Sequence, residues 1–369
     1  MSPHIPDDLP VATLDASRLI TAVGRATDAL GRYDGLLRGM LNADLMLSPL
    51  TNQEAVLSSR IEGTQATLGD VLESDAGEEF DEAKNADIEE VLNYRQALRL
   101  ADRSLSERPI TLGLVRSLHQ VLMKGVRGQD KEPGNFRTTQ NWIGTKGCSM
   151  ENANFVPPSP LILSEHLEAW ERYIAGEDMD PLIQAAVIHA QFEIIHPFVD
   201  GNGRIGRLLI PLFLFSKGRI HQPRFYLSGY LEANRDEYYA RLRAITEKGE
   251  WNEWVLFFLQ AITIQAKENE RVATAIHALY EEYKLLVREA THSQYSAVVT
   301  DTLFQHPIFR TSAIEADGTI PTASAHKIVQ QLVSAGLVKQ VRKGKGRRPS
   351  LYVFPRLMNL AEGREIFTV

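Results

Sequence analysis

The sequence predicts a mostly α-helical fold, with a small β-hairpin near the middle of the chain and an α+β segment at its C-terminal end. Most of the chain carries apolar residues at the three- and four-residue spacing of amphipathic helices. Residues 127–160 break this periodicity and are rich in Gly, Asn and Pro, which indicates loops with a hairpin. Near the C-terminus, two apolar runs flank the basic tip KGKGRR, as expected for two strands joined by a turn.

The N-terminal region is predicted to be helical. Its predicted helices cover residues 17–40, 49–64 and 87–105. Thr51 or Asn52 is expected to cap the second of these helices, and Gly63 to end it. The acidic stretch over residues 73–90 is interpreted as a solvated loop that leads into the third helix, and no function is assigned to it.

The middle of the chain is predicted to contain four further helices. They cover residues 108–126, 164–176, 180–195 and 205–218. The third has an apolar face that indicates a position in the core. The fourth is almost wholly apolar and ends at Gly218, and Pro211 inside it removes a backbone donor and predicts a kink.

The last ~85 residues are predicted to form a separate domain, at the low end of ordinary domain size. A helix over about residues 322–335 is followed by two strands around the basic tip, an order that resembles a winged helix. The predicted organisation is therefore an N-terminal helical region (1–105), a helical core that contains the hairpin (106–275) and a winged-helix-like domain (285–369).

The composition is that of a soluble globular protein. Hydrophobic residues make up 44% and charged residues 24% of the 369 residues, which excludes wholesale disorder. The net charge of −7 argues against general coating of nucleic acid, although a local basic patch could still bind one. The single cysteine, Cys148, excludes disulfides within the chain and argues against a cysteine-rich zinc site. With neither a secretory signal nor an apolar run of ~20 residues, we expect a cytoplasmic protein without a membrane partner.

The segment HPFVDGNGRIGR, residues 196–207, concentrates one histidine, one aspartate, three glycines and two arginines. Its GNGRIG part fits the GxGxxG pattern of dinucleotide-binding folds, but helical periodicity precedes it where a strand is required. A P-loop is excluded because no Lys-Ser or Lys-Thr follows the glycines. We therefore interpret the segment as a loop between two helices that opens the second helix.

The residue types in this loop suit the handling of phosphate groups. Backbone N–H groups at a helix start can bind an anion, and glycines let a ligand come close. Arg204 and Arg207 are three residues apart on one helical face, and their guanidinium groups suit phosphate oxygens. Asp200 would repel phosphate unless Mg²⁺ lies between them, and His196 can accept a proton near neutral pH. Together these residues fit nucleotide-dependent transfer to a hydroxyl group.

A purely structural interpretation exists for each of these residues. His-Pro commonly ends a helix, Asp-Gly-Asn-Gly commonly forms a turn, and Arg204 and Arg207 would then be surface charges. Their coincidence in one loop favours function. By contrast, Phe198 is expected to be an apolar plug that orients the loop, and His189 a satisfied core or interface histidine.

HPFVDGNGRIGR resembles the signature of the Fic family, HPFx(D/E)GNGRxxR, at every fixed position. PGNFRTTQNWIG and NANFVPPSP are similar to the loop and the flap that precede the family's catalytic helices. The resemblance covers residues 50–266. It implies a largely helical enzyme that transfers AMP from ATP to a Ser, Thr or Tyr hydroxyl of a target protein, or of itself, and releases pyrophosphate.

The resemblance also implies a role for individual residues. His196 would deprotonate the target hydroxyl, and Asp200 would hold Mg²⁺ on the phosphates of ATP. The residues expected to contact the nucleotide are Gly201, Asn202, Gly203, Arg204, Ile205, Gly206 and Arg207. The flap expected to hold the target segment comprises Asn154, Phe155, Val156 and Pro157. The residues Asn234, Tyr238 and Tyr239 would line the adenine side, or else belong to the packing of an amphipathic helix.

The stretch SSRIEG, residues 58–63, matches the family's inhibitory pattern (S/T)xxxE(G/N) through Ser58, Glu62 and Gly63. The resemblance implies that Glu62 pairs with Arg207 and occupies the arginine that should hold the γ-phosphate of ATP. A misplacement of the α-phosphate by about 1 Å can cost about 10²-fold in rate. In some relatives the same glutamate supports AMP removal, so a second role for Glu62 stays open.

Other functions stay open beside this one. The winged helix could make the chain a DNA-binding transcription regulator with the Fic fold as a nucleotide sensor. The basic residues that would then contact DNA phosphates are Lys343, Lys345, Arg347 and Arg348. The same domain could instead dock the target or support a homodimer, and the Fic fold could be catalytically idle. Transfer of phosphate or phosphocholine, as in some family members, is disfavoured because Arg207 is intact.

Overall fold

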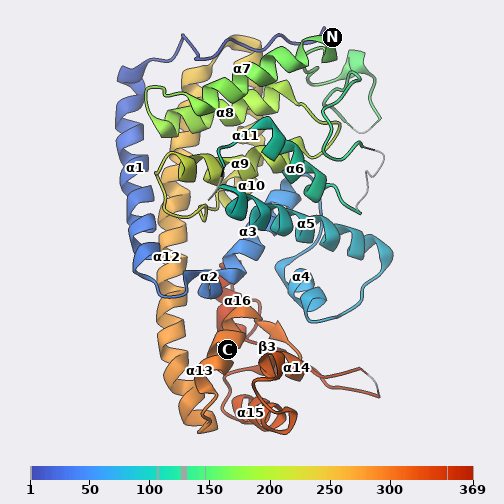
Figure 1. Ribbon diagram of the computed structural model, residues 1–369, viewed down its shortest axis with the longest axis vertical. Coiled ribbons are helices and arrows are strands. Elements are labelled where there is room, and N and C mark those ends of the chain that lie inside the picture. Colours follow the sequence, from blue (N-terminus) through green and yellow to red (C-terminus); the bar gives the residue numbers. More distant parts are fainter. Residues whose placement is uncertain (1, 106–107, 126–130, 146, 347, 369) are drawn as a thin grey trace. The chain divides into compact units, whose positions relative to one another are not determined.

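The computed structural model describes residues 2–105, 108–125, 131–145, 147–346 and 348–368. Within these ranges the chain is mostly helical and has a small antiparallel sheet near the C-terminus, so the predicted fold class is confirmed (Figure 1). The chain groups into two compact units. Unit 1 comprises residues 1–34, 57–64 and 92–267, and unit 2 comprises residues 35–56, 65–91 and 268–369. The division into regions 1–105, 106–275 and 285–369 stays a prediction.

Several long helices contribute residues to both units, because the unit boundaries fall inside them. They are α1 (Ala16–Gly39), α3 (Ser48–Ile61), α5 (Glu82–Leu105) and α12 (Trp251–Thr291). The first three correspond to the helices that the sequence predicts for the N-terminal region. Gly63 follows the end of α3 with a left-handed φ of 101°, a conformation that favours glycine after a helix C-terminus.

The expected cap of α3 is wrong. The helix begins at Ser48, so Thr51 and Asn52 lie within its first turns and cannot cap it. Pro49 explains the earlier start, because a proline in the first turn has no N–H that would need an acceptor and its φ already suits a helix.

The interpretation of residues 73–90 as one solvated loop is also wrong. The helix α4 (Leu68–Asp75) ends inside this stretch, and α5 begins at Glu82. Thr67 and Asp70 form a capping box that starts α4, with each side chain bonded to the backbone N–H of the other residue. Between the two helices, Glu78 is buried rather than solvated.

The core of unit 1 is built from the helices around residues 196–207. In chain order, its shorter helices are α6 (Leu112–Leu122), η1 (Met150–Asn152), η2 (Pro160–Ile162), α7 (Leu163–Ala175), α8 (Pro181–Ile195), α9 (Asn202–Ser216), α10 (Ser228–Ala233) and α11 (Arg235–Lys248). The helix α8 packs between α7 and α9 and is buried on nearly all sides, which is typical of a helix at the centre of a domain. Trp170 and Trp254 donate their indole N–H groups to carbonyl oxygens of α8, at 3.0 and 2.9 Å.

The ends of α8 and the length of α9 follow from local chemistry. Asp180 caps α8 by accepting the N–H of Leu182 at 2.7 Å, and Pro181 occupies the first helical position. The helix α9 continues through Pro211, which has no N–H to donate to the carbonyl of Arg207.

In the part of the chain that the structure describes, no helix combines the length and the apolar character needed to cross a bilayer.

Unit 2 contains α2 (Ala43–Met46), α4 and the C-terminal elements. The latter are α13 (Ser296–Gln305), β1 (Ile308–Phe309), α14 (Thr311–Ile314), η3 (Ala316–Gly318), α15 (Thr322–Ser334), β2 (Lys339–Arg342), β3 (Leu351–Val353) and α16 (Pro355–Glu362). The strand order is β1-β3-β2, all antiparallel, with Ile308 and Lys339 both paired to Val353. The predicted helix over residues 322–335 and the two strands around the basic tip are confirmed, and β1 is an additional strand.

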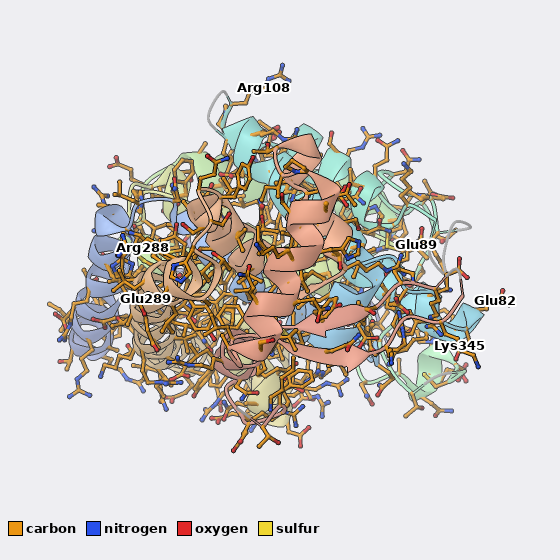
Figure 2. All side chains as sticks on the ribbon, turned by 90° about the horizontal axis from the view of Figure 1, so that it is seen from below. Glu82, Glu89, Arg108, Arg288, Glu289 and Lys345 are labelled. Carbon is orange, nitrogen blue, oxygen red and sulfur yellow. The ribbon has the colours of Figure 1, made fainter. Side chains whose placement is uncertain are left out.

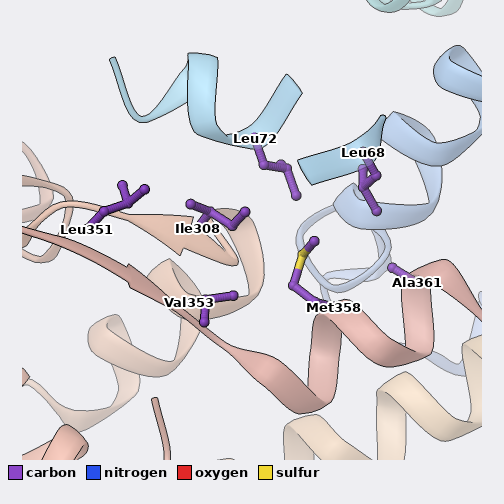
Figure 3. Packing of buried hydrophobic residues seen from close by; sticks show 7 residues of the cluster. All are labelled: Leu68, Leu72, Ile308, Leu351, Val353, Met358 and Ala361. Carbon is purple, nitrogen blue, oxygen red and sulfur yellow. The ribbon is translucent and has the colours of Figure 1, made fainter. Parts of the chain in front are cut away.

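An apolar cluster joins α4, the sheet and α16 (Figure 3). Its buried members are Leu68, Leu72, Ile308, Leu351, Val353, Met358 and Ala361. Burial of a side chain such as leucine or valine stabilises the fold by roughly 1.5–3 kcal/mol. The helix α4 therefore shares one core with elements that follow it more than two hundred residues later in the chain.

Replacing Leu72 by Ala should lower the free energy of unfolding by about 2–5 kcal/mol, because it leaves a cavity in this cluster. Urea denaturation followed by circular dichroism measures the change. Leu285→Ala is the matched control, because the Leu285 side chain lies on α12 and is 52% exposed. Equal losses in the two variants would contradict the position of Leu72 in the core.

Candidate active site

The loop between α8 and α9 has an unusual backbone at both of its ends. His196 ends α8 in the left-handed conformation, with φ 49° and ψ 60°. Gly201, with φ 75°, precedes the first residue of α9. A left-handed backbone is uncommon for a residue other than glycine and clusters at functional sites. The sequence motif thus forms a tight connection between two buried helices.

The His196 imidazole is held in one tautomer. Its Nδ1 lies 3.3 Å from the carbonyl oxygen of Glu193, which can only accept, so Nδ1 carries the proton and Nε2 keeps its lone pair. Burial lowers the pKa of His196 to about 4, and the nearby Arg137 guanidinium acts in the same direction. The ring is therefore neutral at physiological pH, with a basic nitrogen available to a substrate.

Asn202 closes the loop by bonding to its backbone. The side-chain Oδ1 accepts the N–H of Phe198 at 2.8 Å, and Nδ2 donates to the carbonyl of Phe198 at 2.9 Å. The Phe198 ring is fully buried and stacks on His119 at a centroid distance of 3.7 Å, which matches the expected apolar plug. Because the Asn202 amide is used in this way, Asn202 can offer a ligand its backbone N–H rather than its side chain.

Arg137 fixes the backbone of the same loop, although sequence analysis did not single it out. Its guanidinium donates to the carbonyl of His196 at 2.9 Å and to that of Pro158 at 2.6 Å, and its own N–H donates to the carbonyl of Pro197 at 2.9 Å. The residue is 2% exposed, and burial lowers its pKa to about 10, so it remains charged at neutral pH. It ties the flap and the loop together through carbonyl oxygens.

His119 is a second positioning residue that sequence analysis missed. Its Nδ1 accepts the N–H of Gly134 at 2.9 Å, so the protonated Nε2 donates to the carbonyl of Asp200 at 3.0 Å. Burial lowers the pKa of His119 to about 4. The only hint in the sequence is a histidine at a core-facing position of a predicted helix, which does not distinguish it from a packing residue.

Asp200 has a partly exposed carboxylate at the end of the loop. Its side chain is 46% exposed, and Oδ1 accepts the N–H of Gly201 at 2.6 Å and lies 3.7 Å from Nη2 of Arg204. Among the described residues, no three His, Cys, Asp or Glu side chains cluster in a way that could hold a metal. A single accessible carboxylate suits Mg²⁺, which commonly takes most of its ligands from substrate phosphates and water.

Arg204 and Arg207 are not surface charges. They are 5% and 2% exposed, so the structural interpretation of both residues is wrong. Nη2 of Arg204 lies 3.8 Å from the sulfur of Met123. The Arg207 guanidinium instead reaches α3, where Nε donates to Oγ of Ser58 at 3.0 Å and Nη2 donates to the carbonyl of Ser58 at 2.8 Å.

Glu62 forms an ion pair with Arg207. Oε1 of Glu62 lies 2.7 Å from Nη2 of Arg207. Burial alone would raise the pKa of the Glu62 carboxyl, but the Arg207 guanidinium holds it below its ordinary value. Burial alone would likewise lower the pKa of Arg207, and Glu62 raises it above its ordinary value. Both groups are therefore charged at neutral pH.

Gly203 provides the space that this carboxylate occupies. A Cβ atom at Gly203 would lie 2.2 Å from Oε1 of Glu62 and 2.9 Å from Nη1 of Arg207, so any side chain there would collide with the ion pair. The carboxylate thus lies against the first turn of α9, whose backbone N–H groups lack partners within the helix. Glu62 occupies the position where the sequence predicts a phosphate.

The other residues that are predicted to contact the nucleotide differ in how deeply they are buried. Ile205 is fully buried in the core, and a Cβ at Gly206 would lie 2.3 Å from Oε1 of Glu193. Tyr238 is buried with its hydroxyl 2.9 Å from Nε2 of His189. The core position expected of this histidine is confirmed, but its buried Nδ1 has no hydrogen-bond partner among the described residues, so it is only partly satisfied. Burial raises the pKa of Tyr239 to about 12, while the residue as a whole remains 37% exposed.

Asn234 and the flap complete the predicted site residues. The Asn234 amide donates to the carbonyl of Tyr230 at 2.9 Å, between α10 and α11. In the described residues the predicted flap hairpin is one antiparallel bridge, Ile143 to Phe155. Asn154 is exposed, Phe155 is half-buried, and Val156 and Pro157 are buried. The carbonyl of Val156 already accepts the N–H of His4 at 2.9 Å.

The sequence matches two family models. Residues 20–103 match the model described as Fic/DOC family N-terminal, and residues 109–214 match the model described as Fic/DOC family. Together these matches cover more than half of the chain.

Curated relatives resemble part of the chain. The protein adenylyltransferase Fic of Drosophila grimshawi is 30% identical over 218 residues, which are 56% of this chain and 41% of that protein. A probable protein adenylyltransferase of Aquifex aeolicus is 26% identical over 208 residues, which are 54% of this chain and 57% of that protein. The matched segment is thus less than two thirds of the length of either relative.

Solved structures share the fold. A Fic family protein from Desulfovibrio desulfuricans G20 matches with a TM-score of 0.59 at 17% identity, over 96% of this chain and 98% of that chain. Fic-1 from Caenorhabditis elegans matches with a TM-score of 0.52 at 20% identity, over 72% of this chain and 76% of that chain.

The low pKa of His119 predicts that stability falls in mild acid. An unfolded histidine has a pKa near 6.5, so below that pH the unfolded chain binds a proton that the folded site excludes. As pH falls from 6.5 towards 4, each such histidine should remove about 1 kcal/mol of stability per pH unit. The free energy of unfolding, measured with urea at several pH values, should therefore fall less steeply with decreasing pH in His119→Gln than in the wild type. His326→Gln, at an exposed position, is the control, and an unchanged slope in His119→Gln would contradict the prediction.

Proposed function

This chain belongs to the Fic/DOC family, and from that membership we propose that it is a protein adenylyltransferase. It transfers AMP from ATP to a Ser, Thr or Tyr hydroxyl of a target protein. The observation that carries the proposal is the geometry of one loop. A neutral histidine with a free Nε2 lies on the same short loop as a helix N-terminus backed by two buried arginines.

The reaction needs a base, and His196 has the chemistry for it. The hydroxyl oxygen attacks the α-phosphorus of ATP, the bond from that phosphorus to the bridging oxygen of the β-phosphate breaks, and pyrophosphate leaves. Nε2 of His196 takes the hydroxyl proton as the new P–O bond forms. Since Arg137 and the Glu193 carbonyl hold the imidazole and its backbone, the base needs little reorganisation before it acts.

The phosphates have a positively polarised surface to bind. The first turn of α9, from Asn202 through Gly203, offers backbone N–H groups, and Arg204 adds a buried positive charge. Asp200 would hold Mg²⁺, which neutralises phosphate charge when bound. The partly exposed Tyr239 is the best placed of the predicted adenine-side residues, because the Tyr238 ring is buried in the core.

Glu62 inhibits this activity in the proposed scheme. Arg207 can hold the γ-phosphate only after it releases the Glu62 carboxylate, and the Glu62 oxygen lies directly against Gly203. With the γ-phosphate displaced, the α-phosphate is misaligned for in-line attack, which can cost about 10²-fold in rate. The contacts of Arg207 with Ser58 and Glu62 support this role, because they engage the guanidinium from the side of α3.

ATP labelled at the α-phosphate should label protein in the presence of Mg²⁺, whereas ATP labelled at the γ-phosphate should not. His196→Ala should lower the initial rate by about 10²–10⁴-fold, because it removes the general base. Scintillation counting of protein-bound label measures which phosphate is transferred and at what rate. The chain itself and candidate target proteins serve as acceptors. His326→Ala serves as the control for an exposed histidine. Protein labelled by γ-phosphate would replace the proposal with phosphorylation.

Glu62→Gly should raise the initial rate of AMP transfer by about 10²-fold, because Arg207 becomes available to the γ-phosphate. Glu365→Gly removes an exposed carboxylate near the C-terminus and should leave the rate unchanged. The measurement is the early, linear phase of α-label incorporation, before any removal of AMP matters. A rate for Glu62→Gly at or below that of the wild type would refute the inhibitory role while leaving the transferase proposal standing.

A further inference from the structure

Three arginines from the C-terminal part of unit 2 converge on Glu78. We call this group the arginine cluster; it comprises Arg310 after β1, Arg342 at the end of β2, and Arg348, the last residue of the basic tip. Nη2 of Arg310 lies 2.8 Å from Oε1 of Glu78, and Nη2 of Arg348 lies 2.7 Å from Oε2. Both terminal nitrogens of Arg342 also donate to the two carboxylate oxygens. Glu78 comes from the connection between α4 and α5.

Glu78 is held more tightly than a surface carboxylate. Its side chain is 3% exposed, and the hydrogen bonds from Arg342 hold its pKa well below the ordinary value in spite of burial. The side chains of Arg310 and Arg342 are also largely covered, at 24% and 27% exposed. The carboxylate is therefore an anion enclosed by the arginine cluster.

One carboxylate does not satisfy this cluster. Each guanidinium carries five N–H donors, whereas a carboxylate offers about four acceptor positions. The buried Nε atoms of Arg310 and Arg342 have no hydrogen-bond partner among the described residues. Three positive groups face the single buried carboxylate of Glu78. The Glu73 carboxylate also interacts with Arg342 and Arg348, and Arg310 donates to the carbonyl of Gly77, but neither contact reaches the two buried Nε atoms. An anion with more oxygens, such as a phosphate group, would suit the cluster at least as well.

The surrounding segment has the charge of a polyanion-binding surface. Residues 322–353, which include α15, β2 and β3, contain no Asp or Glu in a chain of net charge −7. The basic residues of this segment are Lys327, Lys339, Arg342, Lys343, Lys345, Arg347 and Arg348. Lys345 projects from the ribbon at the tip between the strands (Figure 2). Arg347, one of the four basic residues expected on DNA phosphates, lies outside the described residues.

We propose that Glu78 is an internal competitor for a DNA phosphate and that the arginine cluster binds the backbone of duplex DNA when Glu78 is displaced. The β2–β3 hairpin adds Lys343 and Lys345, which lie between Arg342 and Arg348 in the chain. Arginine forks bind carboxylate and phosphate in the same bidentate manner, so the two anions compete for the same donors. Because contacts to phosphate carry no sequence information, the binding is independent of DNA sequence.

Competition within one chain explains why the intact protein should bind DNA weakly. Glu78 is tethered close to the arginines, so its effective concentration exceeds that of DNA in solution. Removing its charge, but not its size, releases the cluster. The proposal is independent of AMP transfer, because none of these residues belongs to the site around His196.

Fluorescence anisotropy of a labelled duplex of about 20 base pairs tests this, with the full chain titrated at salt concentrations between about 50 and 200 mM. Glu78→Gln should bind about tenfold more tightly than the wild type, with a salt slope steeper by about 2 because further phosphates are neutralised. Glu79→Gln is the matched control: it removes the same charge from the adjacent, exposed position, and its affinity should change less than twofold. In the triple variant Glu78→Gln/Arg342→Ala/Arg348→Ala, the tenfold gain in DNA affinity should disappear.

An equal affinity of Glu78→Gln and Glu79→Gln would overturn the proposal, as would a gain that survives loss of the two arginines. If circular dichroism shows that Glu78→Gln is unfolded, Arg342→Ala/Arg348→Ala in the otherwise wild-type chain decides the question. That double variant should bind the duplex more weakly than the wild type at low salt, because DNA can no longer displace Glu78 from these two arginines, and an unchanged affinity would overturn the proposal. Tighter binding of polyglutamate than of the duplex would assign the cluster to an acidic protein segment instead.

Discussion

A buried guanidinium requires an anion, and the site around His196 is organised by that requirement. The Arg207 side chain is 1% exposed and cannot lose its charge at physiological pH. An unpaired charge in such a place costs several kcal/mol, so Arg207 is stable only with a carboxylate or a phosphate against it. Glu62 meets the need from within the chain. Inhibition and substrate binding, as proposed, therefore both supply the anion that Arg207 requires. They compete because the Glu62 carboxylate already lies next to Gly203 and Arg207.

The rigidity of this site comes from neutral and backbone groups around the charged ones. Asn202 and His119 bond to carbonyl and N–H groups of the loop, and Arg137 holds carbonyls on both the loop and the flap. The helix α8 is buried on nearly all sides, and α6 buries the face that carries His119. The left-handed backbone of His196 is thus held by its surroundings, and the imidazole keeps one tautomer without an acidic partner.

The parts that local sequence determines were predictable, and those that depend on distant contacts were not. The helices of the core and the loop of residues 196–207 follow from periodicity and from adjacent residues. Ser58 lies on α3 and Glu62 directly follows its last residue. Their approach to Arg207 was expected from the resemblance to the family's inhibitory pattern and not from their spacing alone. Arg137 and His119 could not be, since their partners are mainly carbonyl and N–H groups that any residue provides. Glu78 looked like part of a solvated acidic stretch because the arginines that bury it follow 232 to 270 residues later.

The contact between His4 and the flap has a consequence for any protein that docks there. An extended peptide that pairs with the flap needs free backbone groups on its edge. The carbonyl of Val156 is already bonded to the N–H of His4, and the His4 ring lies 5.7 Å from that of Phe155. The apparent affinity for a target is the intrinsic affinity multiplied by the fraction of molecules whose edge is open. If the N-terminal segment covers the edge roughly nine-tenths of the time, recognition weakens about tenfold without any change in the catalytic loop.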